Sequence, residues 1–167
     1  MPADIPAQLS AGQSLLSARQ YSEAKARATT ILEKDPKNLE GLVLMGNALA
    51  GLKDFDGAIS EIEEAIDQDP KQTLWYANLG LIQMANENMA AAKDAFERAV
   101  KADPTSVLAH TALANFLWSQ NQFPEAEAEL KRAYELAPKS APILKALAAF
   151  YANTRRLPQA EPYLKAL

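Results

Sequence analysis

Proline recurs along this chain at a fixed interval of 34 residues. Asp35-Pro36, Asp69-Pro70 and Asp103-Pro104 are separated by that interval, and Ala137-Pro138 falls at the next multiple. Each proline follows a segment with helical periodicity and ends it, because proline cannot extend the helix hydrogen-bond ladder and displaces the preceding residue from the helical region. A period of this length divides the chain into equal units and predicts a repeat architecture.

Counted from this period, the units begin at Ile5, Leu39, Thr73, Val107 and Ala141. Two positions of the unit are small throughout: the eighth is Gly12, Gly46, Gly80, Ala114 and Ala148, and the twentieth is Ala24, Ala58, Ala92, Ala126 and Ala160. Small side chains let the two helices of a hairpin approach closely. Each unit is therefore predicted to be a helix, a tight turn and a second helix, and in the second unit these helices run from Glu40 to Leu52 and from Asp56 to Asp67.

A third position of the unit, the seventeenth, is large and apolar. We expect it in the turn, where it closes the end of the hairpin. It is occupied by Tyr21, Phe55, Met89, Phe123 and Leu157.

These phased residues resemble the tetratricopeptide repeat. The resemblance rests on Gly46, Phe55, Ala58, Ala65 and Pro70 in the second unit, and on Tyr76, Leu79, Gly80, Ala92, Phe96, Ala99 and Pro104 in the third. It covers Ile5 to Leu167 and implies an all-α fold, a right-handed superhelix (α-solenoid) of stacked helix-turn-helix 34-residue repeats. We predict a single domain, residues 1–167, with repeats 5–38, 39–72, 73–106, 107–140 and 141–167, the last of them incomplete.

Composition narrows the classes of function. The net charge of −4 argues against nucleic acid as a partner, and no apolar run is long enough for membrane insertion. The start of the chain has no signal-peptide pattern. We expect a soluble protein, and the absence of cysteine fits either the cytoplasm or the periplasm, so the compartment stays open. With no cysteine and one histidine, neither a cysteine-ligated nor a multi-histidine metal site is possible, and we expect no cofactor. His110 lies at a core position and is interpreted as a hydrogen-bonded packing residue, so nothing in the chain indicates an enzyme.

The first helices carry apolar and amide side chains on a second face, beside the face that builds the hairpin. A helix that is apolar nearly all round is either buried or lines a surface that waits for a partner. In proteins that resemble this family, this face lines a concave groove that holds a peptide. The residues that we expect to bind a peptide are Val43, Leu44, Asn47, Leu74, Asn78, Leu81, Met84, Leu108, Asn115, Trp118 and Lys145.

Two interpretations of these residues are open. The apolar ones either bury a peptide or pack on neighbouring first helices. The asparagines either form hydrogen bonds with a peptide main chain, for which their amides are suited, or bond to solvent and local groups. The basic residues of the related clamp for chaperone carboxy-termini are missing, since Val43 and Leu108 stand at two of the matching positions. Lys145 is the candidate for pairing with a ligand carboxylate.

The sequence therefore predicts a scaffold or adaptor that binds a protein or peptide partner in a mostly apolar groove. A second hypothesis follows from the incomplete fifth repeat, which leaves Leu164 and Leu167 without a capping helix. In that case the chain oligomerises with other copies through its C-terminal repeat. In a third hypothesis the chain is a fragment of a larger protein and recruits substrates for it.

Overall fold

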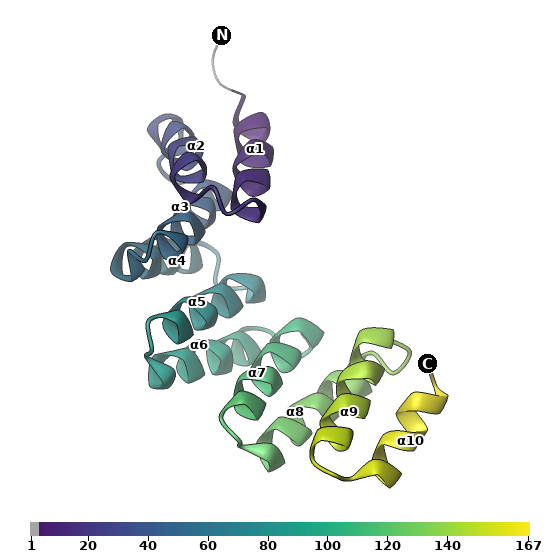
Figure 1. Ribbon diagram of the computed structural model, residues 1–167. Coiled ribbons are helices and arrows are strands. Elements are labelled where there is room, and N and C mark those ends of the chain that lie inside the picture. The colour runs from purple at the N-terminus through teal and green to yellow at the C-terminus, as the bar shows by residue number, and fades with distance from the viewer. Residues whose placement is uncertain (1–3) are drawn as a thin grey trace. The chain divides into compact units, whose positions relative to one another are not determined.

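Residues 4–167 of the computed structural model fold into ten α-helices and contain no β-strand (Figure 1). The first helices of successive hairpins are α1 Ile5–Ser17, α3 Leu39–Gly51, α5 Thr73–Ala85, α7 Val107–Ser119 and α9 Ala141–Asn153. The second helices are α2 Tyr21–Lys34, α4 Phe55–Gln68, α6 Met89–Ala102, α8 Phe123–Leu136 and α10 Leu157–Lys165. The predicted all-α class is confirmed.

Helix starts follow the period, because each first helix begins at the residue where the sequence places the start of a repeat. Within the second repeat both predicted helices are displaced by one residue at their start. The side chain of Asn38 accepts a hydrogen bond from the Gly41 N–H, and that of Asp54 accepts one from the Gly57 N–H. These N-caps begin the helices at Leu39 and Phe55. The seventeenth position is therefore the first residue of the second helix, and the expectation that it lies in the turn was wrong.

The aspartate of each Asp-Pro pair has a structural role. Its Oδ1 accepts a hydrogen bond from the backbone N–H two residues later, at 3.3, 3.2 and 2.9 Å for Asp35, Asp69 and Asp103. This bond forms a local turn across the proline, which cannot donate. The aspartate therefore stabilises the exit of one repeat into the next, and Ala137 has no carboxylate to do the same.

Every hairpin turn contains one residue in the left-handed region, with φ between 59° and 65°. These residues are again 34 apart: Arg19, Lys53, Glu87, Asn121 and Arg155. None is glycine, although a side chain raises the energy of this conformation. The turn that joins the two helices therefore requires a positive φ, which the residue types at this position, apart from Asn121, do not predict.

Close approach within the second hairpin is confirmed at Gly46. A Cβ at this position would lie 2.7 Å from Cγ1 of Ile62 and 3.1 Å from the backbone oxygen of Ala58. All five alanines at the twentieth position are at most 1% exposed. The small residues that the period places in register are therefore the ones at which the helices meet.

The chain divides into two compact units, of which the first ends at Ala95 and the second runs from Phe96 to Leu167. The boundary falls inside α6. In unit 1, α3 packs beside both α1 and α5, and these three helices form the first-helix layer of unit 1. In unit 2, α7 packs on α8, α8 on α9, and α9 on α10. Across residues 4–167, none of the helices combines the length and apolar character that a membrane crossing requires.

Candidate peptide-binding surfaces

Charge is distributed unevenly between the helices of unit 1. The three helices of the first-helix layer carry one charged residue, Glu40. The second helices α2 and α4 carry five each. Charged side chains remain hydrated on a free surface, whereas contact surfaces at the core of an interface are poor in them. The first-helix layer is therefore the face of unit 1 with the composition of a binding surface.

A groove of about 190 Å³ opens on this layer, and we call it the unit-1 groove. It is lined by Gln13 and Leu16 of α1, by Glu40, Val43, Leu44 and Asn47 of α3, and by Leu74 and Trp75 of α5. Four of these were predicted as peptide-binding residues, namely Val43, Leu44, Asn47 and Leu74. The structure thus brings together, from two helices, residues that lie far apart in the sequence.

The four predicted residues differ in how much surface they offer. Leu74 is 52% exposed, and Val43 and Asn47 are half-buried. Leu44 is only 3% exposed, because its side chain packs against Gly12 of the neighbouring α1. Leu44 thus stabilises the contact between first helices and also forms part of the groove wall.

Three further predicted residues continue along α5. Leu81 is 58% exposed, while Asn78 and Met84 are half-buried. Leu74, Asn78 and Leu81 follow one another at helical spacing, so they lie along one face of the helix. This face extends the apolar surface beyond the unit-1 groove.

The predicted residues of α7 lie in unit 2. Leu108 is 45% exposed and Asn115 is exposed. The Trp118 indole is half-buried, and its ring packs edge-on against Phe150 of α9 with centroids 5.2 Å apart. Trp118 therefore packs on a neighbouring first helix and presents the rest of its ring to solvent.

Lys145 lies apart from the other predicted residues of unit 2. It lines a groove of about 300 Å³ together with Ala148, Ala149 and Ala152 of α9 and with Leu164 and Leu167. We call this the C-terminal groove. Leu164 is 58% exposed and Leu167 is 53% exposed.

A charged network that sequence reasoning missed links α8 to the turn before α10. Glu127 accepts hydrogen bonds from Lys131 Nζ at 2.7 Å, from Arg156 Nη1 at 2.6 Å and from the Tyr151 hydroxyl at 2.9 Å. Burial opposes ionisation of Glu127, but these donors outweigh it and lower its pKa to about 2. Burial, followed by the neighbouring Glu127 carboxylate, raises the pKa of Tyr151 to about 12.

The network also contributes to the packing of unit 2, through Arg156. The Arg156 guanidinium lies over the rings of Phe150 and Tyr151, 5.3 and 4.9 Å from their centroids. Such cation–π contacts hold the turn on α9. Beside the network a depression of about 680 Å³ is lined by Phe123, Pro124 and Glu127 and by residues 153–156. No residue predicted from the sequence as a binding residue lines it.

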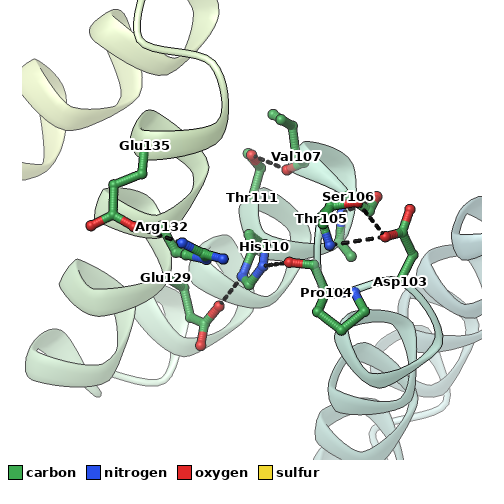
Figure 2. Close-up of polar contacts among 11 residues, drawn as sticks. Asp103, Pro104, Thr105, Ser106, Val107, His110, Thr111, Glu129, Arg132 and Glu135 are labelled. Carbon is green, nitrogen blue, oxygen red and sulfur yellow. Dashed lines mark hydrogen bonds and ion pairs between the residues drawn. The ribbon is translucent and has the colours of Figure 1, made fainter.

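His110 is the packing residue that the sequence predicts. Figure 2 shows its imidazole between the Glu129 side chain and the Pro104 carbonyl, with Nδ1 2.6 Å from Oε2 and Nε2 2.9 Å from the carbonyl oxygen. The side chain is buried, and both ring nitrogens are engaged. At the same repeat position Tyr76 donates its hydroxyl to the Pro70 carbonyl at 3.0 Å. Both residues thus tie a first helix to the proline turn that precedes it.

Metal-binding groups are not assembled in the part of the chain that the structure describes. Across residues 4–167, no three His, Cys, Asp or Glu side chains are placed to hold one ion. The unit-1 groove and the C-terminal groove each offer a ligand apolar surface and one charged side chain, and the unit-1 groove also offers side-chain amides.

Solved structures of other proteins share this fold. A thermophilic TPR protein of Thermus thermophilus, TTC0263, is 21% identical, with 98% of this chain and 90% of that chain covered and a TM-score of 0.74. PilF of Pseudomonas aeruginosa is 18% identical, covering 97% and 74% of the two chains at a TM-score of 0.71. MamA of Desulfovibrio magneticus RS-1 is 18% identical, covering 99% and 94% at 0.68. At these identities the likeness concerns the fold. Among proteins with curated descriptions, none matches the sequence.

The sequence also matches two family models of the tetratricopeptide repeat. One model matches residues 77–141, and the other matches residues 15–82 and 117–167. Together with the helix starts at intervals of 34 residues, these matches show that the chain belongs to the tetratricopeptide repeat family.

Proposed function

We propose that the chain is an interaction scaffold whose unit-1 groove binds an extended segment of a partner protein. Proteins of this family are generally protein–protein interaction modules. The observation that carries the proposal is the first-helix layer of unit 1, where a groove lined by apolar and amide side chains opens on three helices with one charge among them.

Apolar burial supplies most of the binding free energy in this mechanism. Side chains of the partner remove the exposed surface of Val43 and Leu74 from water, at about 25 cal/mol for each Å² of apolar surface buried, while the buried Leu44 forms part of the groove wall. The amides of Asn47 and Asn78 form hydrogen bonds with the partner main chain, since an amide both donates and accepts. Because the helices hold the groove in place before binding, the ordering cost falls on the partner alone.

Exposed residues farther along the first helices extend the proposed contact surface. Leu81 and Met84 continue it along α5 in unit 1. In unit 2, taken by itself, we propose that Leu108, Asn115 and Trp118 also contact a partner, since their side chains all retain accessible surface.

A displayed library of random peptides, selected against the full chain, tests the proposal. Trp75 lines the unit-1 groove and the other tryptophan, Trp118, lies in unit 2. In a Trp118→Phe variant the fluorescence of Trp75 therefore reports on the unit-1 groove, and in a Trp75→Phe variant that of Trp118 reports on unit 2. We expect selected peptides to shift the emission of Trp75.

Substitution of an exposed leucine provides the control. Leu74→Asp places a charge in the groove and is expected to weaken binding by about tenfold or more. Leu52→Asp changes another exposed leucine of unit 1, which does not line the groove. Equal affinities for these two variants, or a library that yields no binder, would refute the proposed groove.

A second candidate function is self-association through the C-terminal groove. It is lined by the small residues Ala148, Ala149 and Ala152, by Lys145 and by the exposed leucines Leu164 and Leu167. A hollow and a projecting apolar side chain on one face are self-complementary, which suits a two-fold contact between copies. The occupant that we propose is therefore the same face of a second copy.

Sedimentation over a range of protein concentrations tests this candidate. Leu164→Glu is expected to abolish concentration-dependent association, because it places a charge inside the contact. Leu157→Glu is the matched control, since Leu157 is 66% exposed on the same helix and lies outside the groove. A wild-type chain that remains monomeric at every concentration would exclude the candidate.

A further inference from the structure

We propose that the segment held in the unit-1 groove presents an arginine side chain, which pairs with Glu40. This inference rests on the proposed function and adds the chemistry of the partner: an apolar peptide with a basic residue among its apolar ones. The groove brings together one charged, one aromatic and two amide side chains that suit such a ligand.

Glu40 is the charge that the groove offers to a ligand. The other seven lining residues are neutral, and the three first helices contribute no further charged side chain. The Glu40 side chain is exposed, so a ligand can reach its carboxylate. An apolar ligand without a cation would displace water from this carboxylate and leave it unpaired, which costs binding free energy. A ligand that carries a cation at this point recovers that cost.

Arginine suits the remaining groups of the groove. Trp75 lines the same groove, and a guanidinium stacks on an aromatic face while it pairs with a carboxylate. The side-chain oxygens of Gln13 and Asn47 provide further acceptors for its five N–H donors. Leu16 and Val43 offer apolar surface to the methylene stem. A lysine ammonium pairs with the carboxylate but cannot stack as a plane, so we expect lysine to bind more weakly than arginine.

Glu40 also has a structural explanation that the experiment must separate from recognition. It lies in the first turn of α3, where a carboxylate complements the helix dipole and slightly stabilises the helix. If that were its whole role, Glu40→Gln would change stability slightly and leave the choice of ligand unchanged.

Selection from the random peptide library provides the first test. Wild-type protein is expected to enrich peptides in which arginine neighbours a large apolar residue. Glu40→Lys reverses the charge in the groove and is expected to enrich acidic residues instead. The same sequence preferences for both proteins would overturn the inference, because a structural carboxylate does not choose the ligand.

Affinity measurements on the most enriched peptide provide the second test. We expect Glu40→Gln to weaken its binding by about tenfold, and replacement of the peptide's arginine by glutamine to do the same in the wild type. In Glu40→Gln the arginine and glutamine peptides should bind equally, and the salt dependence of the arginine peptide should become shallower. Glu33→Gln is the matched control, since it removes the same charge from an exposed position on α2.

The outcomes separate this inference from the proposed function. Peptides that bind without arginine, lose affinity with Leu74→Asp and are indifferent to Glu40→Gln would leave the groove as a binding site and exclude the arginine. A library that yields no binder for the wild type, or binders unaffected by Leu74→Asp, would overturn both proposals.

Discussion

The two units pack the same repeat in different ways. All six glycines of the chain lie in unit 1, and several of them mark close approaches between helices. A methyl group at Gly12 would overlap Leu44, and one at Gly51 would overlap the ring of Tyr21. In unit 1, therefore, glycines stand where side chains of a neighbouring helix pack directly against the backbone.

Unit 2 has no glycine but holds eight of the twelve aromatic residues: Phe96, Phe116, Trp118, Phe123, Tyr134, Phe150, Tyr151 and Tyr163. Phe150 is fully buried and packs against Trp118, Phe123 and Tyr151, with ring centroids 5.2 to 6.5 Å apart. The Glu127 network adds ion pairs to this packing, and the His110–Glu129 contact adds a buried polar pair. The two units thus share the helical frame of the repeat but fill it with different kinds of residues.

We expect the largest effect from the removal of the Phe150 ring, which is fully buried in unit 2. Phe150→Ala should destabilise that unit by about 4 kcal/mol, because it deletes a fully buried aromatic side chain and leaves a cavity. Hydrogen exchange of backbone amides, followed by mass spectrometry, should show faster exchange in α7–α9. Faster exchange of equal size in α1–α4 would contradict the role of Phe150 as a packing residue of unit 2.

Acid should weaken unit 2 through Glu127. Its pKa is lowered in the folded state, so its stabilising contribution is present above the unfolded value near 4.5 and is lost as the pH falls toward 2. The loss should be about 2 kcal/mol across that range, because solvent around the partly exposed ion pairs screens their interaction. Urea unfolding followed through Trp118, in a Trp75→Phe background, measures it. Glu127→Gln, which cannot ionise, should show a smaller decrease over the same pH range, and an equal decrease would exclude the network as its source.

Reciprocal substitutions at the eighth repeat position should both destabilise. Gly46→Ala crowds Ile62 and the backbone of Ala58, which outweighs its gain in helix propensity. Ala114→Gly removes a fully buried methyl group and lowers helix propensity in α7. We expect about 1.5 kcal/mol in each case, measured by urea unfolding. A stabilising effect of either change would show that one residue type suits both units.

A stabilising change is available in α5. The Gln83 side-chain oxygen is buried without a hydrogen-bond partner. Leucine occupies the same position in three other repeats, namely Leu15, Leu49 and Leu117. Gln83→Leu should therefore stabilise unit 1 by about 1 kcal/mol. A lower urea midpoint for the variant would indicate that the amide has a partner in solution.

The smallest expected effect concerns the left-handed turn residues. Lys53→Gly in unit 1 should stabilise by about 0.5 kcal/mol, because glycine adopts a positive φ without strain but gains entropy in the unfolded chain. Asn121→Gly in unit 2 should change stability less, since asparagine tolerates this region. Urea midpoints of the two variants test the order, and a larger gain at Asn121 would reverse it.

The candidate site was predictable in part. Gln13, Leu16 and Glu40 occupy the same repeat positions as Asn47, Met84 and Leu74, so counting the binding face from the first repeat would have found them. Trp75 has no such signal, because it lies next to the core residue Tyr76 and its access to the groove depends on how α5 packs against α3. The exposure of the individual residues was not predictable either. Leu44 and Leu74 lie on the same face, but only Leu44 is buried, because it packs against Gly12 of α1.

The all-α class, the period and, to within one residue, the helix starts of the second repeat could be read from the sequence alone. Those features are local, because proline, cap residues and small positions act on neighbours within a few turns of helix. The tertiary structure alone decided the contacts between distant residues: His110 with Glu129 and Glu127 with Arg156, which are 19 and 29 positions apart. It also decided the boundary at Ala95 and the membership of the unit-1 groove. Such contacts depend on which side chains meet when hairpins stack, and a repeat period leaves that choice open.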